Sequence, residues 1–339
     1  MFDLHSIRMV YNDKSGTLEK FSLLKIFLMF RDVILLLKII IFSRIEIVIY
    51  CISNSKIAFL KDFIFLFICK LIFRKYVVCW SHGNHENRII NESPLLNRLY
   101  GFIFSRIDSI VINGEKFRNY WLKYFDDKNI ITIYNAISEE YIDKNSSKKA
   151  KGEKTVILFL AIMIREKGWC DLLEAANILI KKYDNLLFKF CGPWHNDNDI
   201  NYFNNFVKNN KLDANVEYAG EKHGIEKEQI FLNSDIFVFP TFFKSETFGI
   251  VNIEAMKYKL PVISTNIAAI PEINDDGNTG FIIEKNNINQ IVEKIEYFIF
   301  NPDRIKSMGM NGFERFLKLF TEKTFVNKWL ALVNNIGMR

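Results

Sequence analysis

The chain has 339 residues, of which 49% are apolar and 25% charged, a composition that excludes a disordered protein. A chain of this length is long for one hydrophobic core and fits two domains. The net charge of +6 equals the excess in residues 1–75, which contain 12 Lys+Arg and 6 Asp+Glu. The five cysteines are irregularly spaced and form no C-x-x-C pair, which predicts reduced thiols in a cytoplasmic protein, with neither a disulfide framework nor a zinc site.

The N-terminal region is basic and rich in Phe and Leu. It opens on polar residues, MFDLHSIRMVYNDKSG, which do not form a secretory signal. The apolar stretch 21–42 is interrupted by Lys25, Arg31, Asp32 and Lys38, so it does not predict a membrane-spanning helix. Basic and apolar residues together indicate contact with an anionic membrane surface, and a core helix with solvated lysines is the alternative.

The hydrophobic pattern alternates between short β-branched runs and longer helical stretches. In the first half, strands are predicted at Ile45–Cys51, Tyr76–His82, Ser109–Ile112 and Ile130–Tyr134, and helices near 21–41, 56–74, 94–105 and 115–124. In the second half, strands are predicted at Val156–Leu160, Leu187–Cys191, Val216–Ala219, Ile236–Pro240, Pro261–Thr265 and Phe281–Ile283. Helices are predicted there near 169–182, 202–209, 226–233, 250–258, 287–299 and 303–319. This alternation predicts an α/β protein with parallel sheets covered on both faces.

A polar, charged segment separates the two halves. It covers residues 146–154 and is predicted to be a linker. The expected layout is two Rossmann-like doubly wound domains, residues 1–145 and 155–320, that face a cleft. Ligands of such sheets bind at the carboxyl ends of the strands, so we look for site residues there.

Two glutamates, Glu246 and Glu254, bracket a predicted helix start in VFPTFFKSETFGIVNIEAM (238–256). The free amides of Phe248, Gly249 and Ile250 would form a helix N-terminus, which attracts phosphate, and Gly249 has no side chain to obstruct a close approach. A sugar nucleotide carries sugar hydroxyls, a diphosphate and ribose hydroxyls in that order, so two carboxylates around an anion site suit it. A capping carboxylate at Glu246 and a solvated one at Glu254 are the alternatives for each residue taken singly.

A second candidate follows the predicted strand 156–160. Arg165, Lys167 and Gly168 stand in a loop before a predicted helix. A lysine beside a glycine at the carboxyl end of a strand can reach a phosphate. An ordinary polar loop is the alternative.

Together these stretches resemble the retaining glycosyltransferases of glycosyltransferase family 4, which have the two-domain GT-B fold. SETFGIVNIEAMKYKLPVIST (245–265) is similar to the E-x7-E signature of that family. Further similarities occur in REKGW (165–169), FKFCGPW (188–194), VEYAGEK (216–222), NSDIFVFPTFFKSETFG (233–249), PVISTNIAAIPEI (261–273) and DGNTGFII (276–283). The resemblance covers essentially all of residues 155–320.

The resemblance implies a role for each matching residue. Glu254 would bind the ribose hydroxyls, Glu246 would bind the transferred sugar, and Lys167 would neutralise the diphosphate leaving group. The remaining implied donor-binding residues are Thr247, Phe248 and Gly249 through their amides, Gly192 at the nucleobase, and Arg165 as a further candidate.

The resemblance also implies a metal-independent reaction without a cofactor. A UDP- or GDP-linked sugar would be transferred with retention at the anomeric carbon, and the charge would be stabilised by Lys167 and the helix terminus. The acidic run DND (197–199) is predicted in a polar loop rather than after a strand, so it does not predict a metal site. Two departures stand out: Ile162 replaces the family's usual Arg, and Ala268–Ala269 replace a common Gly-Gly. The final helix, within 321–339, is implied to cross back onto the first domain.

The first half resembles the family more loosely. VVCWSHGNHENR (77–88) is similar to the family's strand that ends in H-x-H-G, so His82 would face the cleft near the sugar or its acceptor. A structural role is the alternative for His82, and His85 is the weaker candidate. The family's opening strand and glycine-rich loop have no clear counterpart: either DKSG (13–16) is a minimal version, or the first domain lacks its first βα unit.

The sequence therefore predicts a glycosyltransferase that is cytoplasmic and peripheral at the inner membrane face. Its acceptor would be a growing polysaccharide or a glycolipid, as in capsule or lipopolysaccharide biosynthesis. Nucleic acid is not an expected partner, because the donor half is not basic. Two alternatives stay open, a GT-B enzyme that epimerises nucleotide sugars and a non-catalytic GT-B subunit.

Overall fold

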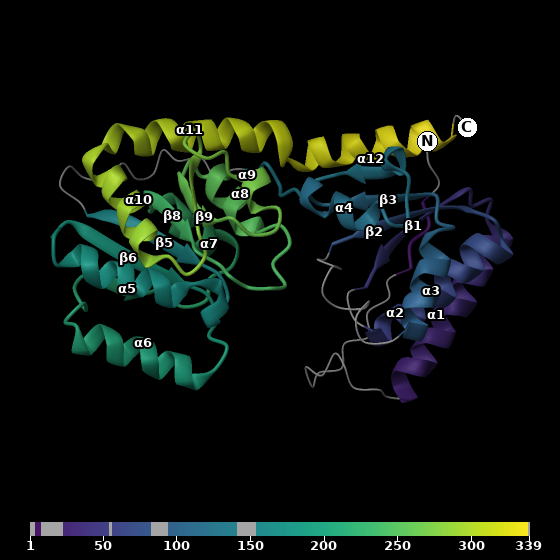
Figure 1. Cartoon of the computed structure of the whole chain (residues 1–339), viewed down its shortest axis with the longest axis horizontal. Helices are drawn as coiled ribbons and strands as arrows, with labels where there is room; N and C mark the ends of the chain where they lie inside the picture. Colours follow the sequence, from purple (N-terminus) through teal and green to yellow (C-terminus); the bar gives the residue numbers. More distant parts are fainter. Residues whose placement is uncertain (1–3, 8–22, 54–55, 83–93, 141–153, 338–339) are drawn as a thin grey trace. The chain divides into compact units, whose positions relative to one another are not determined.

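The computed structural model describes residues 4–7, 23–53, 56–82, 94–140 and 154–337, drawn in colour in Figure 1. The chain divides into two compact units: Met1–Asn113 with Phe117–Thr132, and Gly114–Lys116 with Ile133–Arg339. Most of the predicted linker 146–154 and the candidate His85 lie outside the described residues. The assignment of the final helix to the first domain stays a prediction.

The first unit contains a four-stranded parallel sheet in the order β1-β2-β3-β4. Its strands are β1 (Ile47–Ile52), β2 (Tyr76–Ser81), β3 (Ser109–Ile112) and β4 (Ile130–Thr132). Its helices are α1 (Leu23–Phe42), α2 (Lys56–Phe67), the π-helix η1 (Ile68–Ile72), α3 (Pro94–Phe104), α4 (Arg118–Trp121) and η4 (Asp127–Asn129). The short 3-10 helix η3 (Glu115–Phe117) begins in the segment that belongs to the second unit and ends at the first residue of the returning chain. Every residue of β3 is buried, as expected for a strand covered on both faces. An aromatic cluster of Tyr100, Phe104 and Trp121 forms much of the core between α3 and α4.

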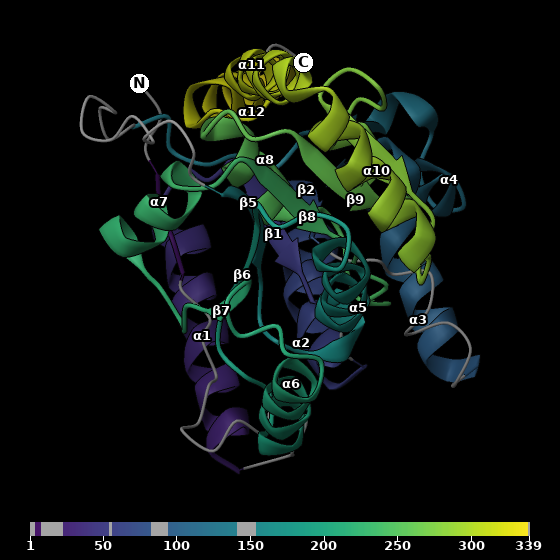
Figure 2. The same ribbon diagram turned by 90° about the vertical axis from the view of Figure 1, so that its left-hand side faces the viewer.

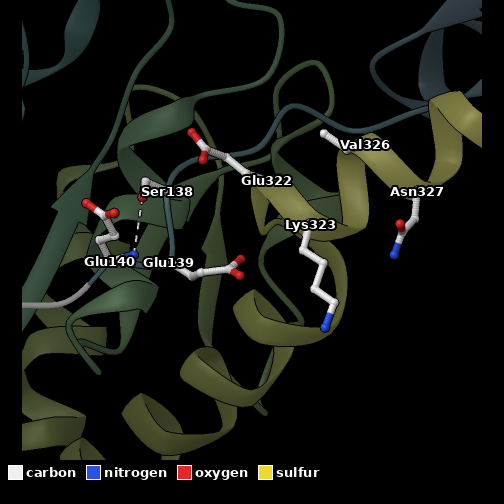
Figure 3. A pocket seen from close by; sticks show the side chains of 7 residues that line it. All are labelled: Ser138, Glu139, Glu140, Glu322, Lys323, Val326 and Asn327. Carbon is white, nitrogen blue, oxygen red and sulfur yellow. Dashed lines mark hydrogen bonds between the residues drawn. The ribbon is translucent and has the colours of Figure 1, made fainter. Parts of the chain in front are cut away.

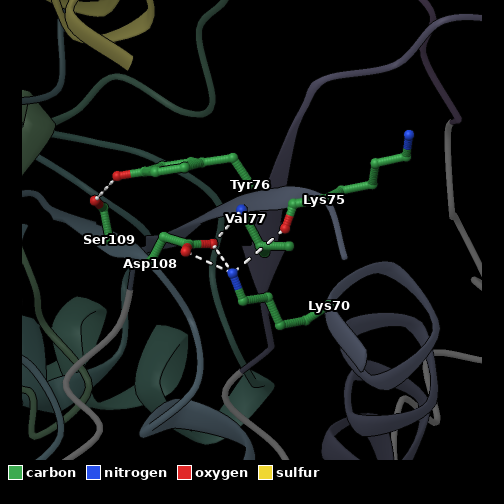
Figure 4. Close-up of polar contacts among 6 residues, drawn as sticks. All are labelled: Lys70, Lys75, Tyr76, Val77, Asp108 and Ser109. Carbon is green, nitrogen blue, oxygen red and sulfur yellow. Dashed lines mark hydrogen bonds and ion pairs between the residues drawn. The ribbon is translucent and has the colours of Figure 1, made fainter. Parts of the chain in front are cut away.

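A polar cluster joins the amino ends of β2 and β3 (Figure 4). The carboxylate of Asp108, just before β3, accepts a hydrogen bond of 2.7 Å from the backbone N–H of Val77. Lys70 binds the same carboxylate, with Nζ 2.6 Å from Oδ2. The Tyr76 hydroxyl and the Ser109 hydroxyl lie 2.9 Å apart beside it. Because this cluster is at the amino ends of the strands, where ligands of such sheets do not bind, its role is structural.

The second unit contains a six-stranded parallel sheet in the order β10-β9-β8-β5-β6-β7. Its strands are β5 (Thr155–Leu160), β6 (Leu186–Cys191), β7 (Val216–Tyr218), β8 (Ile236–Phe239), β9 (Val262–Thr265) and β10 (Gly280–Ile283). Its helices are η5 (Arg165–Lys167), α5 (Trp169–Ile180), α6 (Asp197–Asn209), α7 (Gly224–Leu232), α8 (Ile250–Lys257), α9 (Ile270–Ile273), α10 (Ile288–Phe300), α11 (Pro302–Leu319) and α12 (Glu322–Gly337). This strand order is that of a doubly wound sheet, whose direction of winding reverses between β5 and β8.

Helices cover both faces of this sheet (Figure 2). Right-handed crossovers place α5 and α6 on one face and α7 and α8 on the other. The helix α10 packs against α5, and α11 packs against α8, so each face receives one further helix. All residues of β8 and β9 are buried, which makes the centre of the sheet the core of the unit.

The predicted strands are present, each within two residues of the expected bounds. One local prediction is wrong: residues 197–199 form the first turn of α6 and not a loop. The side chain of Asn196 accepts a hydrogen bond from the N–H of Asp199 and so caps this helix. The short helix α9 was not predicted, because its four residues are too few for a periodic signal. Within the described part of the chain, no helix combines the length and apolarity needed to cross a bilayer.

Candidate functional site

The loops after β5 and β8 meet at the point where the winding of the second sheet reverses. Adjacent parallel strands whose connections leave in opposite directions open a crevice at their carboxyl ends. The loop after β5 leads through Met163 into η5, and the loop after β8 runs from Pro240 to Gly249. The candidate cation Lys167 lies on the first loop and the candidate carboxylate Glu246 on the second.

Backbone contacts fix the two loops against each other. Gly168 has φ +85°, and a Cβ atom there would lie 2.2 Å from the carbonyl oxygen of Pro240, so only glycine allows this approach. The N–H of Phe242 donates to the carbonyl oxygen of Glu166 at 2.7 Å. The Thr265 hydroxyl donates to the carbonyl oxygen of Thr241 at 2.6 Å, which ties the second loop to β9. The positions of Lys167 and Glu246 are therefore set by the scaffold.

Lys167 and Glu246 form an ion pair, with Nζ 2.7 Å from Oε2. Their side chains are 15% and 10% exposed, so the pair is largely shielded from water. The ammonium also lies 4.7 Å from the centre of the Phe243 ring, an attractive cation–π distance. A cation and a carboxylate thus stand together at the carboxyl ends of the strands, the edge at which ligands of such sheets bind.

The helix α8 begins at Gly249, as expected. This glycine is the N-cap residue with φ +75°, and a Cβ atom there would lie 2.7 Å from Nδ2 of Asn252. Asn252 is buried and its Nδ2 donates to the carbonyl oxygen of Gly249 at 3.0 Å. The carbonyl of Thr247 accepts from the N–H of Ala269 at 3.0 Å, and the Phe248 ring is buried, with Tyr134 and Phe320 as neighbours. The Phe248 side chain is therefore part of the core, and its contribution to a ligand site would come from its backbone.

Glu254, on α8, forms the second ion pair of the site. Its Oε1 lies 2.6 Å from Nζ of Lys227 on α7. Sequence reasoning missed Lys227, because a lysine in a polar helical turn is common in this chain. It also missed Asn252, which lies inside the recognised signature but carries no charge.

Gly192 ends β6 in a tightly packed turn. It has φ +139°, and a Cβ atom would lie 1.8 Å from the carbonyl oxygen of Ala161. Its N–H donates to the carbonyl of Gly220 at 3.0 Å, and its own carbonyl accepts from the Tyr218 hydroxyl at 2.8 Å. Ile162, the residue after Ala161, is 42% exposed beside this turn. The backbone around Gly192 is thus pinned at the carboxyl ends of β5 and β6.

Arg165 is directed toward α6. Its Nε donates to Oδ1 of Asp199 at 2.7 Å, and its guanidinium lies 4.5 Å from the centre of the Tyr202 ring. Asp199 is only 5% exposed, and its carboxylate accepts hydrogen bonds from Arg165 and from the side-chain amide of Asn196. Arg165 has a structural partner here, and Lys167 is the cation that faces Glu246.

His82 belongs to the first unit, directly after β2. Its ring lies 4.0 Å from the ring of Trp80, centre to centre. Burial lowers the pKa of the His82 imidazole, so the ring is neutral at neutral pH. Its predicted role toward the sugar or acceptor stays a prediction.

A separate hollow of about 390 Å³ lies between residues 138–140 and the first turns of α12 (Figure 3). Its walls are formed by Ser138, Glu139, Glu140, Glu322, Lys323, Val326 and Asn327. It contains none of the predicted site residues. Across the described ranges, no group of three or more His, Cys, Asp or Glu residues is arranged to hold a metal ion.

The site lies on a two-sheet α/β scaffold that known proteins share. The profile of the family Glycosyl transferases group 1 matches residues 141–315, and the chain belongs to this family. It is 29% identical over 186 residues to the capsular polysaccharide biosynthesis glycosyltransferase CapM of Staphylococcus aureus. The aligned region covers 55% of this chain and 47% of CapM. It is 33% identical over 242 residues to an uncharacterised glycosyltransferase of Methanocaldococcus jannaschii. That aligned region covers 71% of this chain and 64% of the relative. The chain thus spans about half to two thirds of the length of these relatives.

The crystal structure of Anabaena HepE in complex with UDP has the same fold. It superposes with a TM-score of 0.71 at 15% identity and covers 90% of this chain and 82% of HepE. The predicted fold class, GT-B with two Rossmann-like units, is confirmed.

Proposed function

We propose that this chain is a retaining glycosyltransferase of glycosyltransferase family 4 that takes its sugar from a UDP- or GDP-linked donor. The observation that carries the proposal is the pair Lys167–Glu246, 2.7 Å apart, at the reversal point of the donor-half sheet and beside the start of α8. Glu246 accepts hydroxyls of the transferred sugar, and the amides of 247–249 with Lys167 hold the diphosphate. HepE, a structural neighbour, binds UDP.

The proposed reaction exchanges one bond at the anomeric carbon. The bond from this carbon to the diphosphate oxygen breaks, and a bond to an acceptor hydroxyl oxygen forms on the same face. The hydroxyl proton moves to the departing phosphate oxygen. Negative charge grows on the diphosphate as it leaves, and Lys167 and the helix terminus stabilise that charge without a metal ion. His82 is proposed to act near the sugar or its acceptor.

The test begins with the donor. A thermal-shift screen of nucleoside diphosphates and their sugars identifies the ligand that stabilises the folded chain. Transfer with that donor is then compared for wild type, Glu246→Gln and Lys167→Met, with Glu296→Gln as a matched control from a surface Lys–Glu pair of 3.0 Å. We expect the two site variants to lose on the order of 10²–10³ in turnover while their melting behaviour stays normal, and the control to stay active.

Other outcomes decide between the functions. Unchanged turnover in Glu246→Gln contradicts the assignment. A product formed without any acceptor favours an epimerase, and binding without turnover favours a non-catalytic subunit. Anomeric configuration of the product, read by NMR, tests retention.

We also propose that the acceptor is a polysaccharide or glycolipid at an anionic membrane face, as capsule synthesis by the relative CapM suggests. The support lies on α1. Its outward side exposes Phe27, Phe30, Ile34, Ile41 and Phe42 at 53–85%. These positions recur at helical spacing and form one stripe.

The charges on this stripe favour an anionic surface. Lys38 is exposed on the same side of α1. Arg31 is exposed there as well, and its guanidinium also forms an ion pair of 2.8 Å with the buried carboxylate of Asp32. Aromatic side chains beside basic residues are the arrangement by which a helix lies in a lipid interface. The proposed occupant is therefore a bilayer surface rich in acidic lipids.

Vesicle co-sedimentation tests the membrane proposal. We expect binding to vesicles containing phosphatidylglycerol, weaker binding to phosphatidylcholine alone, and a loss of about tenfold or more in Phe27→Ser/Phe30→Ser. Phe300→Ser, at a residue 69% exposed on α10, is the matched control and is expected to bind normally. Absence of vesicle binding, or equal loss in the control, contradicts a lipid-binding stripe and leaves a protein partner as its occupant.

A further inference from the structure

The two glutamates of the site are each paired with a lysine from another element. Glu246 pairs with Lys167, whose role the family resemblance already implies. Glu254 pairs with Lys227, one turn into α7, at 2.6 Å. Nothing in the known signature assigns a function to Lys227.

The ion pair leaves one oxygen of Glu254 available. Lys227 holds Oε1, and among the residues that the structure describes no hydrogen bond reaches Oε2. The side chains of Lys227 and Glu254 are 29% and 20% exposed, so a ligand hydroxyl can reach the carboxylate from solvent. A carboxylate accepts hydrogen bonds at both oxygens, which lets one ion pair and one ligand contact coexist.

Lys227 also lies near the carboxyl end of β6. Burial raises the pKa of the Cys191 thiol at the end of this strand, and the positive charges of Lys222 and Lys227 oppose that rise. Cys191 precedes Gly192, the residue predicted to border the nucleobase. Lys227 is thus tied to Glu254, the residue for which the proposed function assigns a contact with the ribose.

We propose that Lys227 is a positioning residue that fixes Glu254 so that its free oxygen receives a ribose hydroxyl, and that it thereby makes the site selective for ribonucleoside over 2′-deoxyribonucleoside diphosphates. This inference rests on the proposed function. A glutamate side chain that is free to rotate loses conformational entropy when it binds a ligand, and this loss weakens binding. The ion pair with Lys227 orders the side chain before the ligand arrives, so less entropy is lost on binding.

Two other roles for Lys227 make different predictions. If Lys227 only competed with the ribose for Glu254, removing it would strengthen nucleotide binding. If Lys227 only stabilised the fold, removing it would weaken ribo and deoxyribo ligands equally. The ratio of the two dissociation constants separates these roles from positioning.

Isothermal titration calorimetry measures that ratio with UDP, GDP and their 2′-deoxy forms as probes. For the diphosphate that wild type binds, we expect Lys227→Met to weaken the ribo form roughly tenfold and the deoxy form much less, so that the ratio falls toward one. Lys227→Arg keeps the ion pair and is expected to retain most of the preference. Lys182→Met, which removes the lysine of the surface pair with Glu296, is the matched control and leaves the ratio unchanged.

Each result bears on one of the two proposals. A ratio that stays at the wild-type value in Lys227→Met, or a gain in ribo affinity, overturns the positioning role while the donor site stands. Failure of wild type to bind any of the four probes overturns the proposed function and the positioning role together. If Lys227→Met does not fold, the ratio in Lys227→Arg decides: equal affinity for both forms contradicts the inference.

Discussion

The two units fix their sheets by the same device but shape their loops differently. In the first unit, the N–H of Asp108 donates to the carbonyl of Val77, and its carboxylate accepts from the N–H of Val77. In the second unit, Asp235 makes the same two hydrogen bonds with Val156. In both cases the aspartate precedes one strand and clamps the start of its neighbour. The amino ends of both sheets are thus scaffold.

The difference lies in how closely backbone segments approach each other at glycines. In the second unit, Gly168 and Gly192 let backbone segments approach so closely that any Cβ atom would overlap a carbonyl oxygen. Gly101, in α3 of the first unit, has ordinary contacts, because a Cβ atom there would meet its nearest neighbour at 3.9 Å. Close backbone approach is thus a feature of the second unit: it occurs at Gly168 and Gly192 beside the crevice, and also at Gly280 and Gly309 away from it.

The largest expected effect tests this contrast with one substitution in each unit. Gly168→Ala places a methyl group against the Pro240 carbonyl in a left-handed backbone conformation, and we expect a loss of about 3 kcal/mol or more in stability. Gly101→Ala adds a methyl group inside a helix with open space, and we expect a gain of roughly 0.5–1 kcal/mol. Thermal unfolding measures both. Equal effects of the two changes would show that the close approach at Gly168 does not set this position apart from an ordinary helical glycine.

The shared clamp is tested by Asp108→Ala and Asp235→Ala. Each change leaves a backbone N–H without its charged acceptor, which costs roughly 2 kcal/mol. Asp108→Ala is expected to cost more, because Lys70 also loses the carboxylate that it binds. Hydrogen exchange of the peptides around Val77 and Val156 reads each clamp locally. Normal protection of both amides in the variants would show that the clamp does not hold the strands.

Buried carboxylates distinguish the units in a further way. Asp62 of the first unit accepts hydrogen bonds from the Tyr50 hydroxyl at 2.8 Å and the Ser53 N–H at 2.7 Å. Asp171 of the second unit, in the first turn of α5, has a buried Oδ2 without a hydrogen-bond partner. Burial, and then the charge of Glu174, raise the pKa of Asp171 to about 6. A raised pKa means that the folded state favours the protonated form, so ionisation above pH 4 weakens stability as pH rises to about 6.

Asp171→Asn removes this ionisation. We expect a gain of about 1 kcal/mol at pH 7, after allowance for solvent screening, which disappears below pH 4, where Asp171 is protonated in both states. Burial raises the pKa of Asp62 too, but Lys61 and the hydrogen bonds from Ser53 and Tyr50 oppose that rise. Asp62→Asn is expected to lose stability instead, because these charge-assisted hydrogen bonds are replaced by weaker ones to a neutral amide. Urea unfolding at pH 4 and pH 7 measures both. A pH-independent gain in Asp171→Asn would contradict the role of ionisation.

Patterns in the sequence predicted the scaffold and one residue or more of each of the two Lys–Glu ion pairs. The strands follow from β-branched runs. Lys167 and Glu246 were predicted because they stand in loops after strands, close to glycines, and Glu254 was predicted from its spacing to Glu246; the roles of all three stay predictions. Lys227 was missed, because its meaning comes from α7 packing beside α8 and not from its neighbours in sequence. The partner of Arg165 was missed for the same reason: Asp199 is 34 residues away and becomes available only once α6 starts at residue 197.

The smallest expected effect concerns Ala268, one of two alanines where the resembled family commonly has glycine. Ala268 has φ +48°, a left-handed conformation that costs an alanine roughly 1–2 kcal/mol, whereas glycine adopts it freely. Glycine also loses more entropy on folding, so the expected net gain of Ala268→Gly is about 0.5 kcal/mol.

The neighbouring Ala269 has φ −87° and is fully buried, so Ala269→Gly is the matched control and is expected to lose about 1 kcal/mol. Because the Ala269 N–H holds the Thr247 carbonyl beside the site, relief of strain at Ala268 should leave nucleotide affinity unchanged, and calorimetry checks this. Loss of stability in Ala268→Gly would mean that the left-handed turn is already favourable for alanine and that the departure from the family is neutral for folding.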